Sequence, residues 1–201
     1  MKKSKIVCVL ACFFAVTFLL FSCGETEKIA PVDIADLSLS ELEGYVAVAK
    51  YKDVSIELGE KSKEEAISDY LTANSKLNKL PEDAVEYYGA QLKEEYKYHA
   101  KQSGRDYDEL LHELGLDEEA LLKEARTLVY KDIIFAIIQK KESICITDEE
   151  KKNFFDRYVT KYAELYGYSE EYVRANLVDE VYQTMLYDKT MEYLIINNDV
   201  K

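Results

Sequence analysis

Residues 121–150, with the sequence LLKEARTLVYKDIIFAIIQKKESICITDEE, decide the fold because they contain most of one long helix and the start of another. Apolar residues recur at spacings of three and four, which is typical of a buried helix face. Asp117 is the expected N-cap of the first helix. Thr147 and Glu150 have the spacing of a capping box and start the second. The apolar side of the first helix carries Ala120, Leu121, Ala125, Leu128, Val129, Ile133, Ala136 and Ile137, and the second helix includes Phe154, Phe155, Tyr158, Tyr162 and Leu165.

Helical spacing continues on both sides of this stretch, so we expect a mainly α protein. Polar caps and glycines mark the helix ends, and a proline is tolerated in a first helical turn. Further helices are predicted around 37–42, from Ser62 through Ala66, Ile67, Tyr70, Leu71 and Leu77, from Pro81 to near Gly104, from Asp106 to Gly115, and from Ser169 to Ile195, with the helix from Thr147 ending at Gly167.

Strand-like alternation occurs in one place, residues 45–58, with the sequence YVAVAKYKDVSIEL. Val46 and Val48, and then Val54, Ile56 and Leu58, follow the two-residue period of half-buried strands. The sequence therefore predicts a short β segment before the helices.

The first 23 residues differ from all the others. Three lysines precede a charge-free apolar run, residues 6–21, which is shorter than the roughly 20 residues that span a bilayer. The run ends in LFSC at residues 20–23, which resembles the lipobox of bacterial lipoproteins despite the bulky Phe21. We expect a lipoprotein signal helix, and lipid (diacylglycerol and palmitate) on Cys23 that holds the chain at the extracytoplasmic face of the cell membrane. The alternatives are an ordinary cleaved signal with an incidental cysteine and a retained helical anchor.

These patterns divide the chain into four parts. We expect a signal peptide at 1–22, a spacer at 23–44, a short β segment with a helix at 45–79, and a helical domain at 80–201.

Charge and composition exclude several functions. Without the three lysines of the signal, 23 basic residues remain against 39 acidic ones, a formal charge of −16. Such a chain repels nucleic-acid phosphates. His99 and His112 lack nearby metal-type partners, and Cys145 is expected as a small core residue. We expect no catalytic residue, no metal site and no cofactor.

The chain has 17 tyrosines and no tryptophan, and many of the tyrosines fall along three predicted helices. Tyrosine combines a large apolar ring with a polar end, which suits a surface that binds apolar segments and stays soluble. One interpretation is that the rings replace phenylalanine in half-buried helix packing. The other is a binding surface for unfolded chains, for which the selected residues are Tyr88, Tyr96, Tyr158, Tyr162, Tyr172 and Tyr182.

Several spaced segments resemble the C-terminal chaperone domain of bacterial trigger factor, a domain of elongated, SurA-like, multi-helix architecture. They are LPEDAV at 80–85, RDYDELLHELG at 105–115, ARTLVYKDIIFAII at 125–138, ICITDEE at 144–150 and LYDKTMEYL at 186–194. Residues 45–53 are similar to the segment before the family's isomerase domain, although Ala49 and Asp53 stand in place of two glycines.

About twenty residues separate Leu58 from Leu80, where trigger factors carry an isomerase domain, and no ribosome-docking domain is recognised. The resemblance implies a chaperone-like protein that binds unfolded or newly exported polypeptides without catalysis and without a ribosome. The alternatives are a structural or assembly module that binds one folded partner, and a vestigial peptidyl-prolyl isomerase-family protein.

Overall fold

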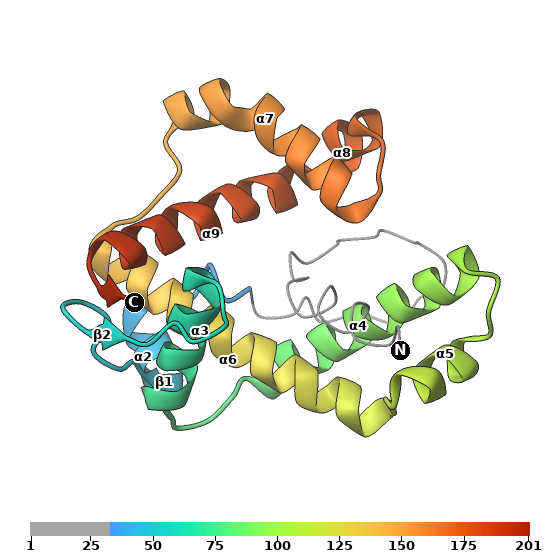
Figure 1. Ribbon diagram of the computed structural model, residues 1–201, viewed down its shortest axis with the longest axis horizontal. Coiled ribbons are helices and arrows are strands. Elements are labelled where there is room, and N and C mark those ends of the chain that lie inside the picture. The colour runs from blue at the N-terminus through green and yellow to red at the C-terminus, as the bar shows by residue number, and fades with distance from the viewer. Residues whose placement is uncertain (1–32) are drawn as a thin grey trace.

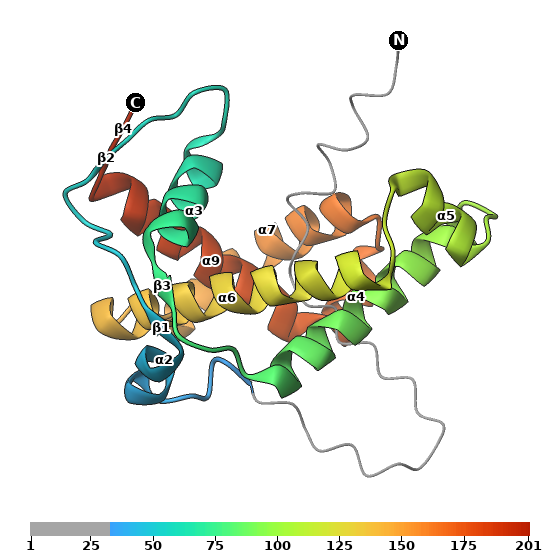
Figure 2. The same cartoon turned by 90° about the horizontal axis from the view of Figure 1, so that it is seen from below.

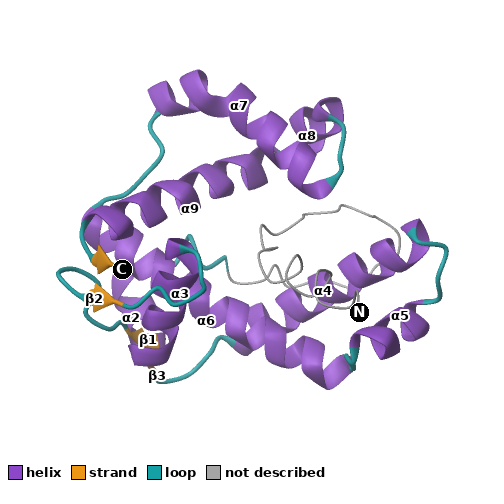
Figure 3. Ribbon diagram, in the orientation of Figure 1, coloured by secondary structure: helices purple, strands orange, loops and turns teal. Residues whose placement is uncertain are grey.

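The structure, a computed structural model, describes residues 33–201. It is mainly helical, and its strands lie at one end of the molecule (Figure 3). The elements are α2 (Leu39–Tyr45), β1 (Val46–Ala47), β2 (Ser55–Ile56), α3 (Lys63–Asn74), β3 (Lys76–Leu77), α4 (Glu82–Gln102), α5 (Tyr107–Leu114), α6 (Glu118–Glu142), α7 (Asp148–Tyr166), α8 (Glu170–Asn176), α9 (Val178–Ile196) and β4 (Asp199–Val200).

Local capping explains most of these bounds. The Asp117 side chain accepts a hydrogen bond from the amide of Ala120 at the start of α6. Thr147 and Glu150 form the predicted capping box of α7. Gly115 and Gly167 end α5 and α7 in the left-handed conformation, which glycine adopts without steric cost.

The β segment is smaller than the alternation at 45–58 predicts. Only Val46–Ala47 and Ser55–Ile56 form strands, and they belong to different sheets. β1 pairs antiparallel with β3, whereas β2 pairs in parallel with β4 at the C-terminus. The alternating apolar residues serve to bury Val46 and Ile56 in the helical core, so the pattern reflects burial more than a sheet.

Three details differ from the sequence-based expectations. Leu77 lies in β3 and is exposed, because α3 ends at Asn74. Cys145 is exposed, so its prediction as a core residue was wrong. The predicted last helix is divided at Leu177 into α8 and α9, and this residue is buried in the core of α7–α9.

A local hydrogen bond contributes to the division of the helix at Leu177. The side-chain amide of Asn176 donates a hydrogen bond to the carbonyl of Tyr172, 3.0 Å away, and so satisfies a carbonyl at the end of α8. The turn lets Leu177 enter the core while α8 folds back against α7.

The main core lies around α6, which is buried along most of its length. Ile133, Ile134, Ile137 and Ile138 meet residues from α2, α3, α4 and α9 there. Figure 1 shows α6 passing beneath α9, and the view from below in Figure 2 shows α4 running beside α6.

Part of the predicted spacer belongs to this core. Leu42 of α2 is fully buried and Ile34 is nearly so. Of residues 23–44, those from Asp33 onward therefore pack on the domain, while the predicted signal peptide and Cys23 lie outside the described residues.

Candidate functional site

Two helical arms extend in the same direction from the body formed by α2, α3 and the C-terminal halves of α6 and α9 (Figure 1). We call α4–α5 with the N-terminal half of α6 the first arm, and α7–α8 with the N-terminal half of α9 the second arm. In each arm, a pair of long helices projects beyond the body. The candidate site is built from the surfaces of these two arms.

The first arm is continuous with the main core. Leu92 and Tyr96 of α4 pack against Leu121 and Ala125 of α6, and all four side chains belong to the main core. Closer to the body, the Tyr88 hydroxyl donates a hydrogen bond to the carboxylate of Asp132. Burial raises the pKa of Asp132 to about 6, although the Tyr88 hydrogen bond and Lys131 act in the opposite direction.

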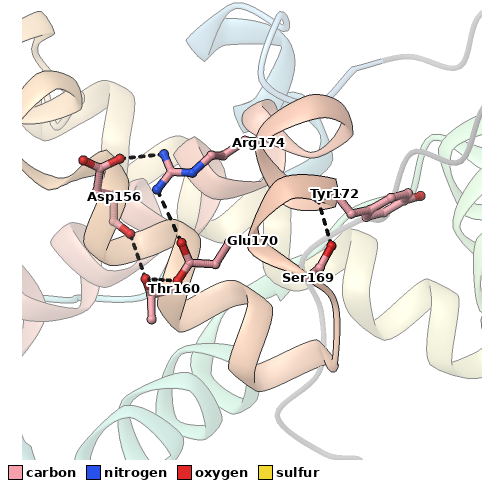
Figure 4. A network of polar contacts seen from close by, with 6 residues as sticks. All are labelled: Asp156, Thr160, Ser169, Glu170, Tyr172 and Arg174. Carbon is pink, nitrogen blue, oxygen red and sulfur yellow. Dashed lines mark hydrogen bonds and ion pairs between the residues drawn. The ribbon is translucent and has the colours of Figure 1, made fainter.

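The second arm has a separate core, formed by Tyr158, Val159, Tyr162, Ala163, Val173, Leu177, Val181 and Met185. On its surface, Arg174 of α8 contacts Asp156 of α7 at 2.6 Å and Glu170 at 3.5 Å (Figure 4). Thr160 donates a hydrogen bond to Glu170 at 2.7 Å, which joins α7 and α8 again. Exposed ion pairs of this kind contribute little individually, so the apolar core carries most of the stability of the arm.

The six tyrosines predicted to bind clients are divided between the arms. Tyr96, Tyr158 and Tyr162 are core residues, in agreement with the alternative interpretation of tyrosine as a packing residue. The other three are half-buried: Tyr88 bonds to Asp132, Tyr172 packs against Tyr168, and Tyr182 packs against Phe155. The structure does not bring the six together on one surface, and their role in client binding stays a prediction.

Groups of the first arm also act on a tyrosine of the second arm. Burial, together with Tyr98 and Glu95 of α4, raises the pKa of Tyr168, which follows the end of α7, to about 12. Glu180, at the start of α9, acts on the same hydroxyl and is itself buried.

The sequence-based selection did not include Tyr98, Tyr168, Glu95 or Glu180. Tyr98 and Tyr168 lie among the many tyrosines of the helices, but nothing in the sequence distinguishes them from Tyr96 or Tyr158. Glu95 and Glu180 read as ordinary polar positions of amphipathic helices. Their assembly depends on the relative placement of two arms that are far apart in the chain.

Large apolar side chains are exposed on both arms. Tyr98 and Leu122 on the first arm and Phe154, Leu165 and Tyr187 on the second arm are 38% to 46% exposed. A shallow pocket of about 360 Å³ lies between the end of α6 and α9, where Ala136, Ile144, Cys145 and Leu186 are among the lining residues. Scattered exposed apolar side chains are normal, but their presence along two projecting arms provides several separate apolar contacts.

Residues 33–201 contain no group of three histidine, cysteine or carboxylate residues suitable for a metal ion. His99 lies 3.7 Å from Glu95, and His112 is exposed. None of the helices in the described part is long and apolar enough to cross a membrane.

The described residues form a helical body with two projecting arms. A family model described as bacterial trigger factor protein (TF) C-terminus matches residues 52–196, and the chain belongs to this family. The match confirms the resemblance seen in the sequence, and it shows a domain type that supports a chaperone-like role and binding of polypeptides. Comparisons with curated proteins and with solved structures give no significant match.

Proposed function

We propose that the protein is a lipid-anchored chaperone that binds exposed apolar segments of unfolded or newly exported polypeptides between its two arms, without catalysis. Lipid on Cys23 would hold the domain at the extracytoplasmic face of the cell membrane, in place of docking on a ribosome. The family match supports the chaperone-like part, and the lipobox-like sequence supports the anchor.

The observation that carries the proposal is the presence of exposed large apolar side chains on both arms. Full burial of one such side chain contributes about 1.5–3 kcal/mol. A client that contacts only one of them is held weakly, because association itself has an entropic cost of several kcal/mol. Contacts to both arms at once favour long unfolded segments over short exposed patches of folded proteins.

Aggregation of a chemically denatured client tests the binding role. The mature chain without lipid, present in several-fold excess, is expected to suppress light scattering by the client. The double variant Phe154→Ser with Leu165→Ser, which removes two exposed apolar side chains of α7, is expected to lose most of this suppression. The control is Ile196→Ser, at a 74% exposed position at the end of α9. If the wild-type chain suppresses the aggregation of none of the clients tested, the proposal is overturned.

Membrane fractionation tests the anchor. The full chain expressed in a bacterium is expected in the membrane fraction, labelled by a radioactive fatty acid. Cys23→Ser is expected to lose the label, whereas Cys145→Ser retains it. Equal labelling of both variants and the wild type would exclude Cys23 as the lipid attachment site.

A structural or assembly module remains the second candidate, because Tyr96, Tyr158 and Tyr162 are packed in cores as this function would allow. Cross-linking followed by mass spectrometry distinguishes the two candidates: a chaperone yields a broad mixture of clients, and an assembly module yields one stoichiometric partner. If the protein is a vestigial isomerase, it is expected to accelerate the proline-limited refolding of a test protein. The proposed chaperone is expected to leave that rate unchanged.

A further inference from the structure

Two segments of the body carry basic residues without acidic ones. Residues 45–52 and 75–80 contain four lysines and neither aspartate nor glutamate, although the mature chain has a formal charge of −16. β1 and β3, which belong to these segments, lie at the end of the molecule away from the arm tips at α5 and α8 (Figure 1). The body therefore presents a local excess of positive charge on a strongly acidic protein.

Backbone contacts join the two segments. β1 pairs antiparallel with β3. The amides of Asn78 and Lys79 donate hydrogen bonds to the carbonyl of Tyr45. The amide of Ala49 donates to the hydroxyl of Ser75, 3.0 Å away. Lysines from both segments are thereby brought to the same part of the surface.

Three of these lysines keep an uncompensated charge. Lys50, Lys76 and Lys79 are exposed, and none of them pairs with a carboxylate in the described part of the chain. Lys79 lies 5.2 Å from the ring centroid of Tyr45, and Lys50 donates to the carbonyl of Asp53 at 3.0 Å. Both contacts leave the positive charge available to an anion.

Leu77 adds an apolar side chain, 44% exposed, between two of the lysines. Successive side chains of a strand point to opposite faces, so Lys76 and Leu77 lie on either side of β3. A flat partner that approaches the edge of this strand can meet both, because the lysine stem is long and flexible. Lys52 pairs with Glu142 at 2.8 Å and is left out. We define the basic surface as Lys50, Lys76, Leu77 and Lys79.

The length of the chain before Asp33 limits how far the basic surface can lie from the membrane. Ten residues, 23–32, separate the predicted lipid on Cys23 from Asp33, and Ile34 is already packed in the main core. Ten residues span at most about 33–36 Å when fully extended. Tyr45, at the basic surface, follows Asp33 after a short segment and α2, which has seven residues and a length of about 10 Å. The basic surface is therefore within reach of the bilayer.

Charge on the first arm favours one orientation. Residues 81–126, which form most of this arm, contain six basic and thirteen acidic residues, a formal charge of −7. An anionic bilayer repels such an arm and attracts the basic surface at the opposite end of the molecule.

We propose that the basic surface lies against the anionic lipid headgroups of the membrane that holds the anchor, with both arms directed away from the bilayer. Each lysine near an anionic bilayer strengthens binding by about fivefold. Three lysines give a weak contact for a free protein, but a tether raises the local concentration enough to maintain it. This inference rests on the proposed function, because the lipid on Cys23 supplies that tether.

Lysine footprinting on vesicles tests the inference. The mature chain with Cys145→Ser is coupled through Cys23 to a maleimide lipid, so that the anchor does not depend on processing in a cell. Cys145 is exposed, and its replacement is expected to leave the fold unchanged. A water-soluble acetylating reagent then modifies accessible lysines, and mass spectrometry measures the rate at each position.

The expected result is slower modification of the basic surface on anionic vesicles. Lys76 and Lys79 should react about three- to tenfold more slowly on vesicles that contain phosphatidylglycerol than on vesicles of phosphatidylcholine alone. Lys123 of α6 and Lys152 of α7, which are exposed on the two arms, should react equally on both. The protection should decrease as salt screens the charges.

Matched double variants locate the contact. Lys76→Gln with Lys79→Gln is expected to remove most of the protection of Lys50. Lys123→Gln with Lys152→Gln makes the same change in net charge at exposed positions of the arms and is expected to retain that protection. Equal effects of the two double variants would overturn the role of the basic surface.

Other outcomes distinguish the possible occupants of this surface. Equal reaction rates of its lysines on both kinds of vesicle overturn the proposal. Protection that develops without vesicles as the protein concentration rises assigns the surface to a second copy of the chain and also overturns it. Failure of Cys23 to acquire a fatty acid in a bacterium overturns the natural anchor, whereas the footprint of the chemically coupled chain still decides whether the basic surface recognises anionic headgroups.

Discussion

The two arms are attached to their supporting helices by the same pair of residue types in different electrostatic surroundings. In the first arm, Tyr88 of α4 bonds to Asp132 of α6, both residues are half-buried, and desolvation raises the pKa of the carboxyl group to about 6. In the second arm, Tyr158 of α7 bonds to Asp188 of α9 at 2.9 Å, and Lys161 pairs with that carboxylate at 2.5 Å. The first attachment lies at the edge of the main core, whereas the second includes an ion pair over a separate small core.

This difference indicates how each arm responds to perturbation. Helix α4 shares its apolar contacts with the body through α6, so the first arm is expected to unfold only when the body unfolds. The second arm has its own core, and α7 connects to α6 through a short segment that begins at Ser143 in a left-handed conformation. Local opening of the second arm is therefore expected at a lower free energy than global unfolding.

The largest expected effect comes from the main core. Ile133→Ala removes a fully buried side chain of α6 and is expected to lower the free energy of unfolding by about 2–5 kcal/mol. Urea denaturation measures this loss, and hydrogen exchange should show weaker protection in every helix. Protection lost from the first arm alone would contradict its continuity with the body.

The matching change in the second core is Leu177→Ala, at another fully buried position. The expected cost is also about 2–5 kcal/mol, but it should fall mainly on local opening of the second arm. Hydrogen exchange is expected to accelerate in α7 and α8 and to stay near wild type in α6. Uniform acceleration along the chain would show that the two cores unfold as one.

The desolvated carboxyl group of Asp132 predicts a dependence of stability on pH. The pKa of Asp132 is raised from its ordinary value near 3.8 to about 6 in the fold. The neutral form is therefore favoured by folding, and stability is lost as the pH rises from about 4 to above 6. Asp132→Asn is expected to stabilise the protein at pH 8 by on the order of 2–3 kcal/mol, with little gain at pH 4.

Asp188→Asn is the matched control in the second arm. It retains an acceptor for Tyr158 but loses the charge that pairs with Lys161, so a loss of less than about 1 kcal/mol is expected at pH 8. Thermal denaturation of both variants at pH 4 and pH 8 measures these effects. Equal behaviour of the two variants would contradict the difference in electrostatic surroundings between the two carboxylates.

The smallest expected effect concerns the connection between α6 and α7. Lys189 of α9 donates hydrogen bonds to the carbonyl of Cys145 at 2.8 Å and to Glu150 at 2.6 Å. Lys189→Met is expected to cost less than about 1 kcal/mol of stability while accelerating proteolysis at 143–147. The control is Lys61→Met, which removes an exposed ion pair with Asp69 near α3. Equal proteolysis of the two variants would show that Lys189 does not restrain the connection.

Helix ends were the most predictable part of the fold. The capping box of Thr147 and Glu150, the N-cap Asp117, and the terminal glycines Gly115 and Gly167 all act where the sequence predicts. The divided helix at Leu177 was not predictable, because that residue leaves the helical conformation to enter a core formed with α7. The pairing of residues 55–56 with 199–200 joins the two ends of the domain, and no local pattern indicates it.

For the candidate site, the sequence predicted the type of residue involved but not which individual residues are exposed. The abundance of tyrosine was plain from the sequence, but Tyr96 was selected whereas Tyr98 is the residue that is exposed. The two lie two positions apart on α4 and therefore point to different sides of the helix. Which side packs against α6 cannot be read from α4 alone.

The sequence by itself determined the helical class, most of the helix ends, the acidic charge and the family of this protein. These features depend on contacts within a few residues, on composition, or on spaced motifs, all of which are present in the unfolded chain. The tertiary structure decided which tyrosines are buried, that each arm has its own relation to the body, and that Glu180 is buried. Those outcomes depend on contacts between residues far apart in the chain, which form only when the helices pack.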